Sequence, residues 1–422
     1  MKTSDSMVKT VEHQIKYSKL FDILNQAVPV LIGIYIFFNP FPHTTSIKEI
    51  CFYLSVVMVL ALLLFKRTDF SFKTPLLIPF GLYVFWTFLS LFFALDKGNS
   101  IHDFYSHLLR YLILYYIVIN FLCSKQKVVV LSWVIIMSTA IISIWLLYYE
   151  YIVLGHKLST RLGGTLNEIS INRIGVLTIF AIILAIQLFK VESHLYRKTI
   201  LVLSFFPLCL ATFMTQTRSS SLALFLSISI LFHKNKKVLA VFLTIFLLLA
   251  VFLPFKNRIT NGTYLNDIRN GTYFNDIRIK NTWVMFEIIK DYPIFGIGFG
   301  MGTYVKYIDF ESYNEELPVN LQPEILLKYP HSIYTEIASR VGIVGLIMFC
   351  CIIFVFFRMC WNTFRNGKET YIKEWGLCML SAFTMFLFIG FFEPIFVHVT
   401  EVVLFLILSL GTIVWKLNAD NE

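Results

Sequence analysis

Long apolar stretches recur along the chain, each separated from the next by a short polar segment. A stretch of about 20 mostly apolar residues is long enough to cross a bilayer as a helix. On that criterion the pattern predicts twelve transmembrane helices, at residues 20–40, 47–65, 75–95, 107–123, 128–153, 171–189, 199–216, 218–233, 238–254, 332–357, 374–392 and 395–415. The expected fold class is therefore an all-α integral membrane protein with about twelve transmembrane helices.

One polar interruption is much longer than the others and divides the single predicted membrane domain. Residues 1–253 hold the first nine predicted helices, residues 254–331 form a large loop, and residues 332–422 hold the last three. The seventh and eighth stretches are separated by almost nothing, which predicts a tight hairpin at residues 215–219.

The large loop contains a tandem repeat and a helical pattern. Residues 261–269 read NGTYLNDIR and residues 270–278 read NGTYFNDIR, a duplication that lengthens the loop. Residues 281–291 place apolar side chains at helical spacing, which predicts an amphipathic helix at the membrane surface. Four alternate glycines follow Pro293, and they predict a bend.

The distribution of basic residues predicts the orientation in the membrane. Short cytoplasmic loops of membrane proteins are rich in Lys and Arg. The loops on the same side as the N-terminus are all basic here, which places both termini in the cytoplasm and the large loop outside. The formal charge of +10 is spread over these loops in a chain with only 15% charged residues. Membrane lipids are therefore expected partners, and nucleic acid is not.

The cysteines and the N-terminus give no sign of other chemistry. The seven cysteines lie in or beside apolar stretches without a Cys-x-x-Cys or Cys/His pattern, so neither disulfides nor a zinc site is expected. The first 19 residues are polar, so the first apolar stretch is expected to remain as an anchor and not to be cleaved.

Charged residues near the outer ends of the predicted helices are candidates for chemistry, because charge at membrane depth is costly. Arg218 lies in the hairpin TQTRSSS, whose hydroxyls suit phosphate oxygens; the alternative is a side chain that only reaches the lipid headgroups. His331 precedes the tenth predicted helix. Imidazole is a natural general base near neutral pH, but a lone histidine there is also often an interfacial polar residue.

Further candidates lie on the same predicted side. Arg278 precedes the amphipathic helix, and Glu393 lies between the last two predicted helices. Arg161 and Arg173 flank a polar segment between the fifth and sixth. Glu336 follows His331 by five positions, whereas Arg340 lies on roughly the opposite helical face. Convergence of these residues on one membrane face is a stronger signal than any of them alone.

Together these motifs resemble the O-antigen ligase family, bacterial glycosyltransferases that attach a finished polysaccharide to lipid A–core. The shared features are TQTR at 215–218, Arg278 before a helix and a glycine-rich turn at 293–300. A His-Ser-x-x-x-Glu motif at 331–336 and Gly-Ile-Val-Gly at 342–345 complete them. The likeness covers nearly the whole chain by topology, and its motifs lie within about residues 161–393. It departs from the family pattern at Thr282, where an aromatic residue is usual, and the duplication leaves Arg269 as a rival of Arg278, which is preferred for its spacing to Pro293.

The resemblance implies a GT-C-like enzyme of the bacterial inner membrane, with its active site facing the periplasm. The implied donor is an O-antigen linked to undecaprenyl pyrophosphate, the acceptor is lipid A–core, and no cofactor or metal is expected. Arg218 and Arg278 would bind the pyrophosphate and His331 would be the catalytic base. Arg161, Glu336 and Glu393 would support them. Attack from the face opposite the leaving group predicts inversion at the anomeric carbon.

Three other functions share part of this pattern. An O-antigen polymerase has similar arginines and the same donor, but its acceptor is a second lipid-linked repeat. A protein O-oligosaccharyltransferase would pass the glycan to a protein, and its members often carry an extra domain. A flippase or transporter would favour charges midway through its helices and inverted repeats, whereas the polar residues here cluster at one face.

Overall fold

The computed structural model describes residues 2–158, 160–162, 171–242, 244, 277–394 and 399–419. Within these ranges the chain forms helices and no strand, which confirms the all-α class. Eight of the described helices are long and apolar enough to cross a membrane: α1 (Lys2–Phe38), α2 (Thr45–Leu64), α6 (Lys125–Tyr148), α7 (Ile171–Val191), α8 (Leu195–Met214), α16 (Ile333–Asn366), α17 (Thr370–Ile389) and α18 (Val399–Ala419). Three shorter apolar helices accompany them: α3 (Leu77–Ser90), α5 (Arg110–Phe121) and α9 (Arg218–Leu231).

Eleven of the twelve predicted stretches coincide with one of these helices. The other, at 238–254, lies mostly outside the described residues, so the count of twelve stays a prediction. Most of the duplication, which includes Arg269, also lies outside the described residues, as do residues 163–170. The tight hairpin is confirmed, because α8 ends at Met214 and α9 begins at Arg218.

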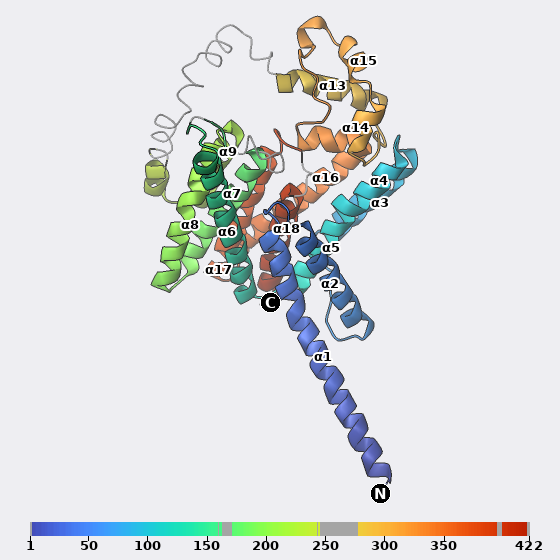
Figure 1. Ribbon diagram of the computed structural model, residues 1–422, viewed down its shortest axis with the longest axis vertical. Helices are drawn as coiled ribbons and strands as arrows, with labels where there is room; N and C mark the ends of the chain where they lie inside the picture. Colours follow the sequence, from blue (N-terminus) through green and yellow to red (C-terminus); the bar gives the residue numbers. More distant parts are fainter. Residues whose placement is uncertain are drawn as a thin grey trace.

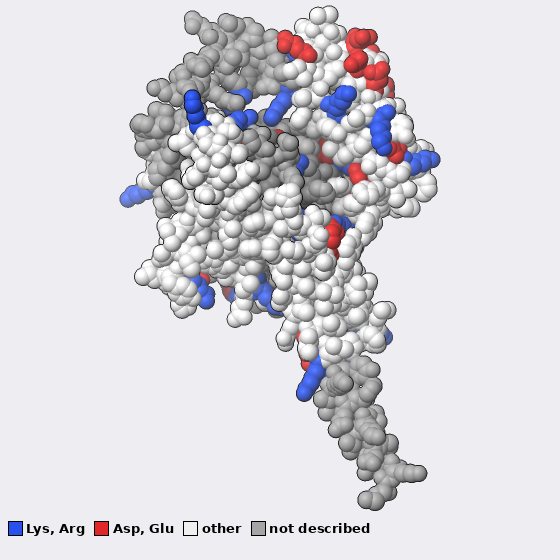
Figure 2. Space-filling view, in the orientation of Figure 1, with Lys and Arg blue, Asp and Glu red and all other residues white. Residues whose placement is uncertain are grey.

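The outer helices and the chain termini lie at opposite ends of the molecule (Figure 1). Helices α13 (Ile277–Asp291), α14 (Gly302–Tyr307) and α15 (Phe310–Glu315) are gathered at the top of the view, whereas the C-terminus lies at the lower edge of the helical bundle and the N-terminus below it. On the face seen in Figure 2 the flank of the bundle shows few charged side chains, which gather above and below it. This arrangement suits a helical bundle in a bilayer, with the large loop and the termini on opposite sides.

The centre of the bundle is formed by α7, α17 and α18. In the membrane-spanning windows of α7 and α18, 78% and 72% of the residues are buried, against 28% in α1 and in α2. Helix α17 packs against α7, α9, α16 and α18. Charged residues at the outer ends of α7 and α18 are consequently enclosed by protein on several sides.

The described part of the large loop has a small core of its own. The predicted helix at 281–291 is confirmed and begins four residues earlier, at Ile277. Val284 and Ile288 are fully buried on its inner side, where they belong to one cluster with Tyr304 and Phe310. The loop residues therefore fold against one another, and the position of α13 at a membrane surface stays a prediction.

Residues 293–302, called here the glycine segment, attach this small core to the membrane helices. The predicted bend after Pro293 is confirmed, since Gly296 and Gly298 have φ angles of 69° and 114°. On one side the segment follows α16: the N–H of Ile297 donates to the carbonyl of Ser339 at 2.8 Å. These contacts use backbone groups, so the close approach depends on the missing glycine side chains.

The other side of the glycine segment is held by α4 (Lys97–Asp103). The N–H of Gly302 donates to Asn99 Oδ1 at 2.8 Å, and that of Met301 donates to Asp103 Oδ2 at 2.8 Å. The N–H of Gly300 donates to Ser100 Oγ at 3.1 Å. Three consecutive polar contacts from one short helix therefore fix the segment in place.

Helix α16 is interrupted where the glycine segment meets it. Gly342 has φ 76° and ψ 175°, which breaks the helical hydrogen bonding. The carbonyl of Val341 accepts a hydrogen bond from Trp86 Nε1 at 2.9 Å. Interrupted helices are tolerated at membrane depth only when neighbouring groups satisfy the released backbone in this way.

Candidate functional site

His331 lies directly before α16, close to Arg278. Ser332 is the N-cap residue of α16, and its Oγ accepts a hydrogen bond from the N–H of Tyr334 at 3.3 Å. His331 is half-buried. Burial lowers the pKa of His331 below its usual 6.5, and the positive charge of Arg278 lowers that pKa further. The imidazole is therefore neutral at pH 7, the protonation state that a general base requires.

The start of α16 is tied to the end of α17, three residues before Glu393. The N–H of Ile333 donates to the carbonyl of Gly390 at 2.7 Å. The ring of Tyr334 packs against that of Phe391, with their centroids 4.6 Å apart. The segments that carry His331 and Glu393 are thus held together by both backbone and side-chain contacts.

Arg173 connects this region to the outer end of α7. Its charge interacts with the carboxylates of Glu393 and Glu401. Two residues farther along α7, Gly175 touches the first turn of α9: a Cβ at Gly175 would lie 2.1 Å from Ser220 Oγ. The beginning of α7 therefore lies between the residues that follow α17 and the hairpin that carries Arg218.

The hairpin before Arg218 is shaped by its own hydroxyls, which corrects one expectation. Thr215 and Thr217 are buried, and their Oγ1 atoms lie 2.8 Å apart. Thr215 Oγ1 also lies 2.7 Å from the carbonyl of Thr212. Gln216 between them has a φ of 50°, unusual for a residue with a side chain. These two hydroxyls stabilise the turn and do not form an open cluster for phosphate, whereas the side chain of Arg218 is exposed.

Arg161 reaches the same hairpin from the loop after α6. Its Nε donates to the carbonyl of Thr215 at 3.0 Å. The N–H of the next residue, Leu162, donates to the carbonyl of Met214 at 2.9 Å. The structure therefore brings the predicted candidates into two groups, His331 with Arg278 and Glu393 near α16, and Arg161 with Arg218 at the hairpin, with Arg173 between them.

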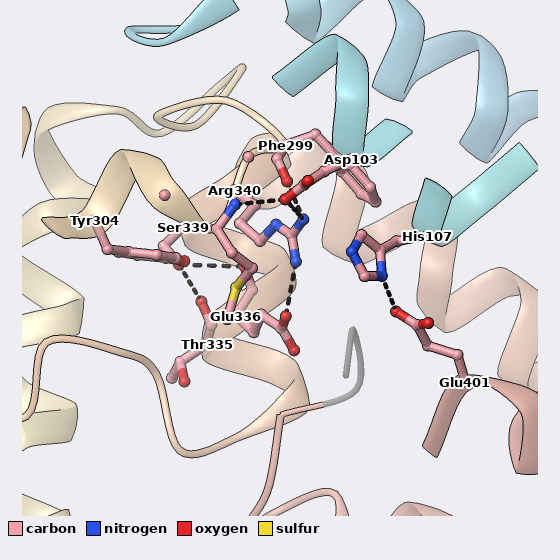
Figure 3. A network of polar contacts seen from close by, with 12 residues as sticks. Asp103, His107, Phe299, Tyr304, Thr335, Glu336, Ser339, Arg340 and Glu401 are labelled. Atoms are coloured by element: carbon pink, nitrogen blue, oxygen red, sulfur yellow. Dashed lines mark hydrogen bonds and ion pairs between the residues drawn. The ribbon is translucent and has the colours of Figure 1, made fainter. Parts of the chain in front are cut away.

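Glu336 belongs to a buried ion-pair network that the sequence analysis did not predict (Figure 3). Arg340 Nη1 lies 2.8 Å from Glu336 Oε1, and both side chains are fully buried. Arg340 also donates to the carbonyl of Phe299 in the glycine segment and lies 3.8 Å from Asp103 Oδ2. The structure pairs Glu336 with Arg340, and the expected support of His331 by Glu336 stays a prediction. The spacing i to i+4 was the available signal, because it places two helical side chains side by side.

A second buried pair lies nearby, between residues far apart in the sequence (Figure 3). His107 Nδ1 is 2.7 Å from Glu401 Oε1, and their side chains are 12% and 1% exposed. His107 lies on a π-helical turn before α5 and Glu401 in the first turn of α18. No local spacing relates these two residues, so the sequence pattern carried no signal for the pair.

A known protein family matches a segment of the chain that includes part of this site. Residues 203–350 match a family model described as O-antigen ligase. This part of the chain resembles the O-antigen ligase family. The resemblance predicted from the motifs is thereby confirmed, and no curated protein matches the chain. The family covers O-antigen ligases and related polymerases, and its members are glycosyltransferase-like enzymes.

The matched segment contains most of the candidate residues. Arg218, Arg278, His331 and Glu336 lie within it, whereas Arg161 and Glu393 lie outside. It also includes the glycine segment and the break in α16. The family match therefore coincides with the part of the structure in which the outer loop is attached to the membrane helices.

Proposed function

We propose that the protein is an O-antigen ligase, which transfers polysaccharide from undecaprenyl pyrophosphate to lipid A–core on the periplasmic face of the inner membrane. The observation that carries this proposal is that His331 lies within the electrostatic reach of Arg278, inside the segment that matches the family. A neutral base beside a permanent cation suits the transfer of a glycan from a lipid diphosphate.

His331 acts as the base in the proposed reaction. Its neutral imidazole takes the proton of an acceptor hydroxyl while that oxygen attacks the anomeric carbon of the donor. The bond between the anomeric carbon and the phosphate oxygen breaks, and the lipid pyrophosphate leaves with the bonding electrons. Attack and departure occur on opposite faces of the sugar, so the configuration inverts.

Arg218 and Arg278 hold the pyrophosphate in this proposal. A guanidinium is always charged and offers paired donors that match phosphate oxygens. Arg278 then has two effects, since its charge lowers the pKa of His331 and also stabilises the leaving group. Charge that develops on the leaving oxygens is held by donors already in place, which lowers the barrier.

A deletion strain separates this function from the related polymerase. Loss of a ligase leaves full-length polymer on the lipid carrier and bare lipid A–core. Loss of a polymerase leaves lipid A–core that carries one repeat. Electrophoresis of lipopolysaccharide from the deletion strain, with the wild-type gene restored as control, distinguishes the two outcomes, and the second would overturn the assignment as a ligase.

A purified assay tests the proposed base and the expected lack of a metal requirement. The protein in nanodiscs is supplied with lipid-linked donor and lipid A–core, and the product is followed by mass spectrometry. His331→Ala is expected to abolish transfer, while a metal chelator leaves it unchanged. Full transfer by His331→Ala would show that another group accepts the proton.

A further inference from the structure

A polar pocket of about 220 Å³ opens at the outer ends of the membrane helices, beside Arg173. Its walls come from the turn between α1 and α2, from the first turns of α2, α5 and α7, and from Val399 of α18. Neither Arg218 nor Arg278 lines it. The pocket has room for about seven water molecules at their liquid volume, enough for a phosphate group and part of the molecule that carries it.

Basic residues dominate the charged lining of this pocket. Lys48, Arg110 and Arg173 contribute three positive charges, and Glu49 contributes one negative charge. Glu393 and Glu401 also attract Arg173, but neither lines the pocket. An excess of positive charge in a pocket with low-dielectric walls favours an anionic ligand.

Arg110 is held rigidly at the pocket wall. Its Nη1 lies 2.8 Å from Glu49 Oε1, and its Cζ lies 4.9 Å from the centre of the Phe52 ring. A second ring, that of Tyr35, lies 5.9 Å away. The Nε of Arg110 is buried and has no hydrogen-bond partner among the described residues. A guanidinium fixed in this way needs little further ordering when it binds an anion.

The rim of the pocket is also preformed. His43 adopts a left-handed conformation with φ 57°, which is unfavourable for a residue with a side chain. The following residue holds the turn, because Thr44 Oγ1 lies 3.0 Å from the carbonyl of Phe38 and 2.8 Å from that of Phe41. Unfavourable backbone angles that the surroundings maintain are concentrated at binding sites.

We propose that this pocket binds a phosphate group carried by a membrane lipid. The pocket opens between helices, where a lipid headgroup can reach it, and its cations match phosphate chemistry. Two lipids in the proposed reaction carry phosphate, the acceptor and the diphosphate donor; the choice between them rests on the proposed function. The charge of Arg173 interacts with that of Glu393, three residues beyond Gly390, whose carbonyl is hydrogen-bonded to the start of α16. The pocket is therefore connected, through these residues, to the segment that carries His331.

The first test measures lipid binding without catalysis. Native mass spectrometry of the full-length protein compares retained phosphatidic acid with diacylglycerol, which lacks the phosphate. Wild type is expected to prefer phosphatidic acid, and Lys48→Gln and Arg173→Gln to weaken its retention about tenfold, the effect of one charge-assisted contact. The exposed control Lys157→Gln, which does not line the pocket, keeps the preference. Equal retention of the two lipids by wild type, or unchanged retention in both pocket variants, would overturn the proposal.

The second test identifies which substrate occupies the pocket. KM is measured for donor and for acceptor with wild type, Lys48→Gln and the charge-preserving Lys48→Arg. A KM rise for phosphorylated acceptor, but not for dephosphorylated acceptor, assigns the pocket to the acceptor; a rise for donor alone assigns it to the donor. Unchanged KM for both contradicts a substrate site. Absence of transfer by wild type counts against the ligase proposal and leaves the lipid-binding result intact.

Discussion

Gly342 faces the backbone carbonyl of Ile294 so closely that a Cβ at position 342 would lie 1.9 Å from its oxygen. The break in α16 at this glycine exposes the carbonyls of Ser339 and Arg340, and both accept hydrogen bonds from the glycine segment. The break and the glycine segment therefore form one structural unit, in which the backbone groups of each are hydrogen-bonded to those of the other. Substitutions in this unit are expected to affect both the stability of the protein and the position of His331.

Gly342→Ala is expected to destabilise the protein severely, by about 3 kcal/mol or more, because it combines an unfavourable φ with a steric clash. Gly81→Ala is the matched control, since nothing lies within 4 Å of a Cβ there. Thermal unfolding of both purified variants measures the difference. Equal stability of the two variants would mean that the backbone of α16 tolerates a side chain at the break.

Glu336→Gln is expected to cost about 3 kcal/mol, because it leaves the buried charge of Arg340 without its nearest carboxylate. The double variant Glu336→Leu with Arg340→Met removes both charges and should be less damaging than the single change. Denaturant unfolding in detergent compares the three proteins. A double variant less stable than Glu336→Gln would show that the pair stabilises the fold beyond charge compensation.

The activity of the wild-type protein should persist below pH 6.5, because the pKa of His331 is lowered and its neutral form survives to lower pH. Arg278→Gln removes the positive charge that contributes to this shift. The pKa of His331 then rises, and the acidic limb of kcat/KM against pH should move to higher pH. A uniform loss of activity with an unmoved limb would assign Arg278 to binding alone.

Arg218→Lys tests whether the hairpin arginine acts through its paired donors. Lysine keeps the charge but cannot bind phosphate oxygens in a bidentate manner. Transfer is expected to fall about tenfold in Arg218→Lys and further in Arg218→Gln, a loss typical of one charge-assisted contact. Arg365→Gln, an exposed arginine at the other end of the bundle, should retain full activity. Wild-type rates in Arg218→Lys would indicate that charge alone suffices.

The helices and the hairpin were predictable because apolar length directly reports the part of a chain that can span a bilayer. Pairing between polar residues was not, because it depends on how the helices pack. His107 and Glu401 meet although 294 positions separate them. The hydroxyl of Thr215 was expected to face phosphate, but it lies within hydrogen-bonding distance of the hydroxyl of Thr217, two positions along the chain. Residue type indicated the chemistry of these groups, and only the fold determined their partners.

Attachment of the outer loop through residues 293–302 also bears on how such a protein can change over evolution. The nine-residue repeat ends at Arg278, in the first turn of α13, whereas the glycine segment that contacts α4 and α16 begins only at Pro293. Extra residues inserted at the repeat lengthen the chain before the glycine segment, and they leave the residues that make these contacts unchanged. The gene can therefore gain or lose copies there while the anchorage downstream, and the histidine that follows it, keep their place.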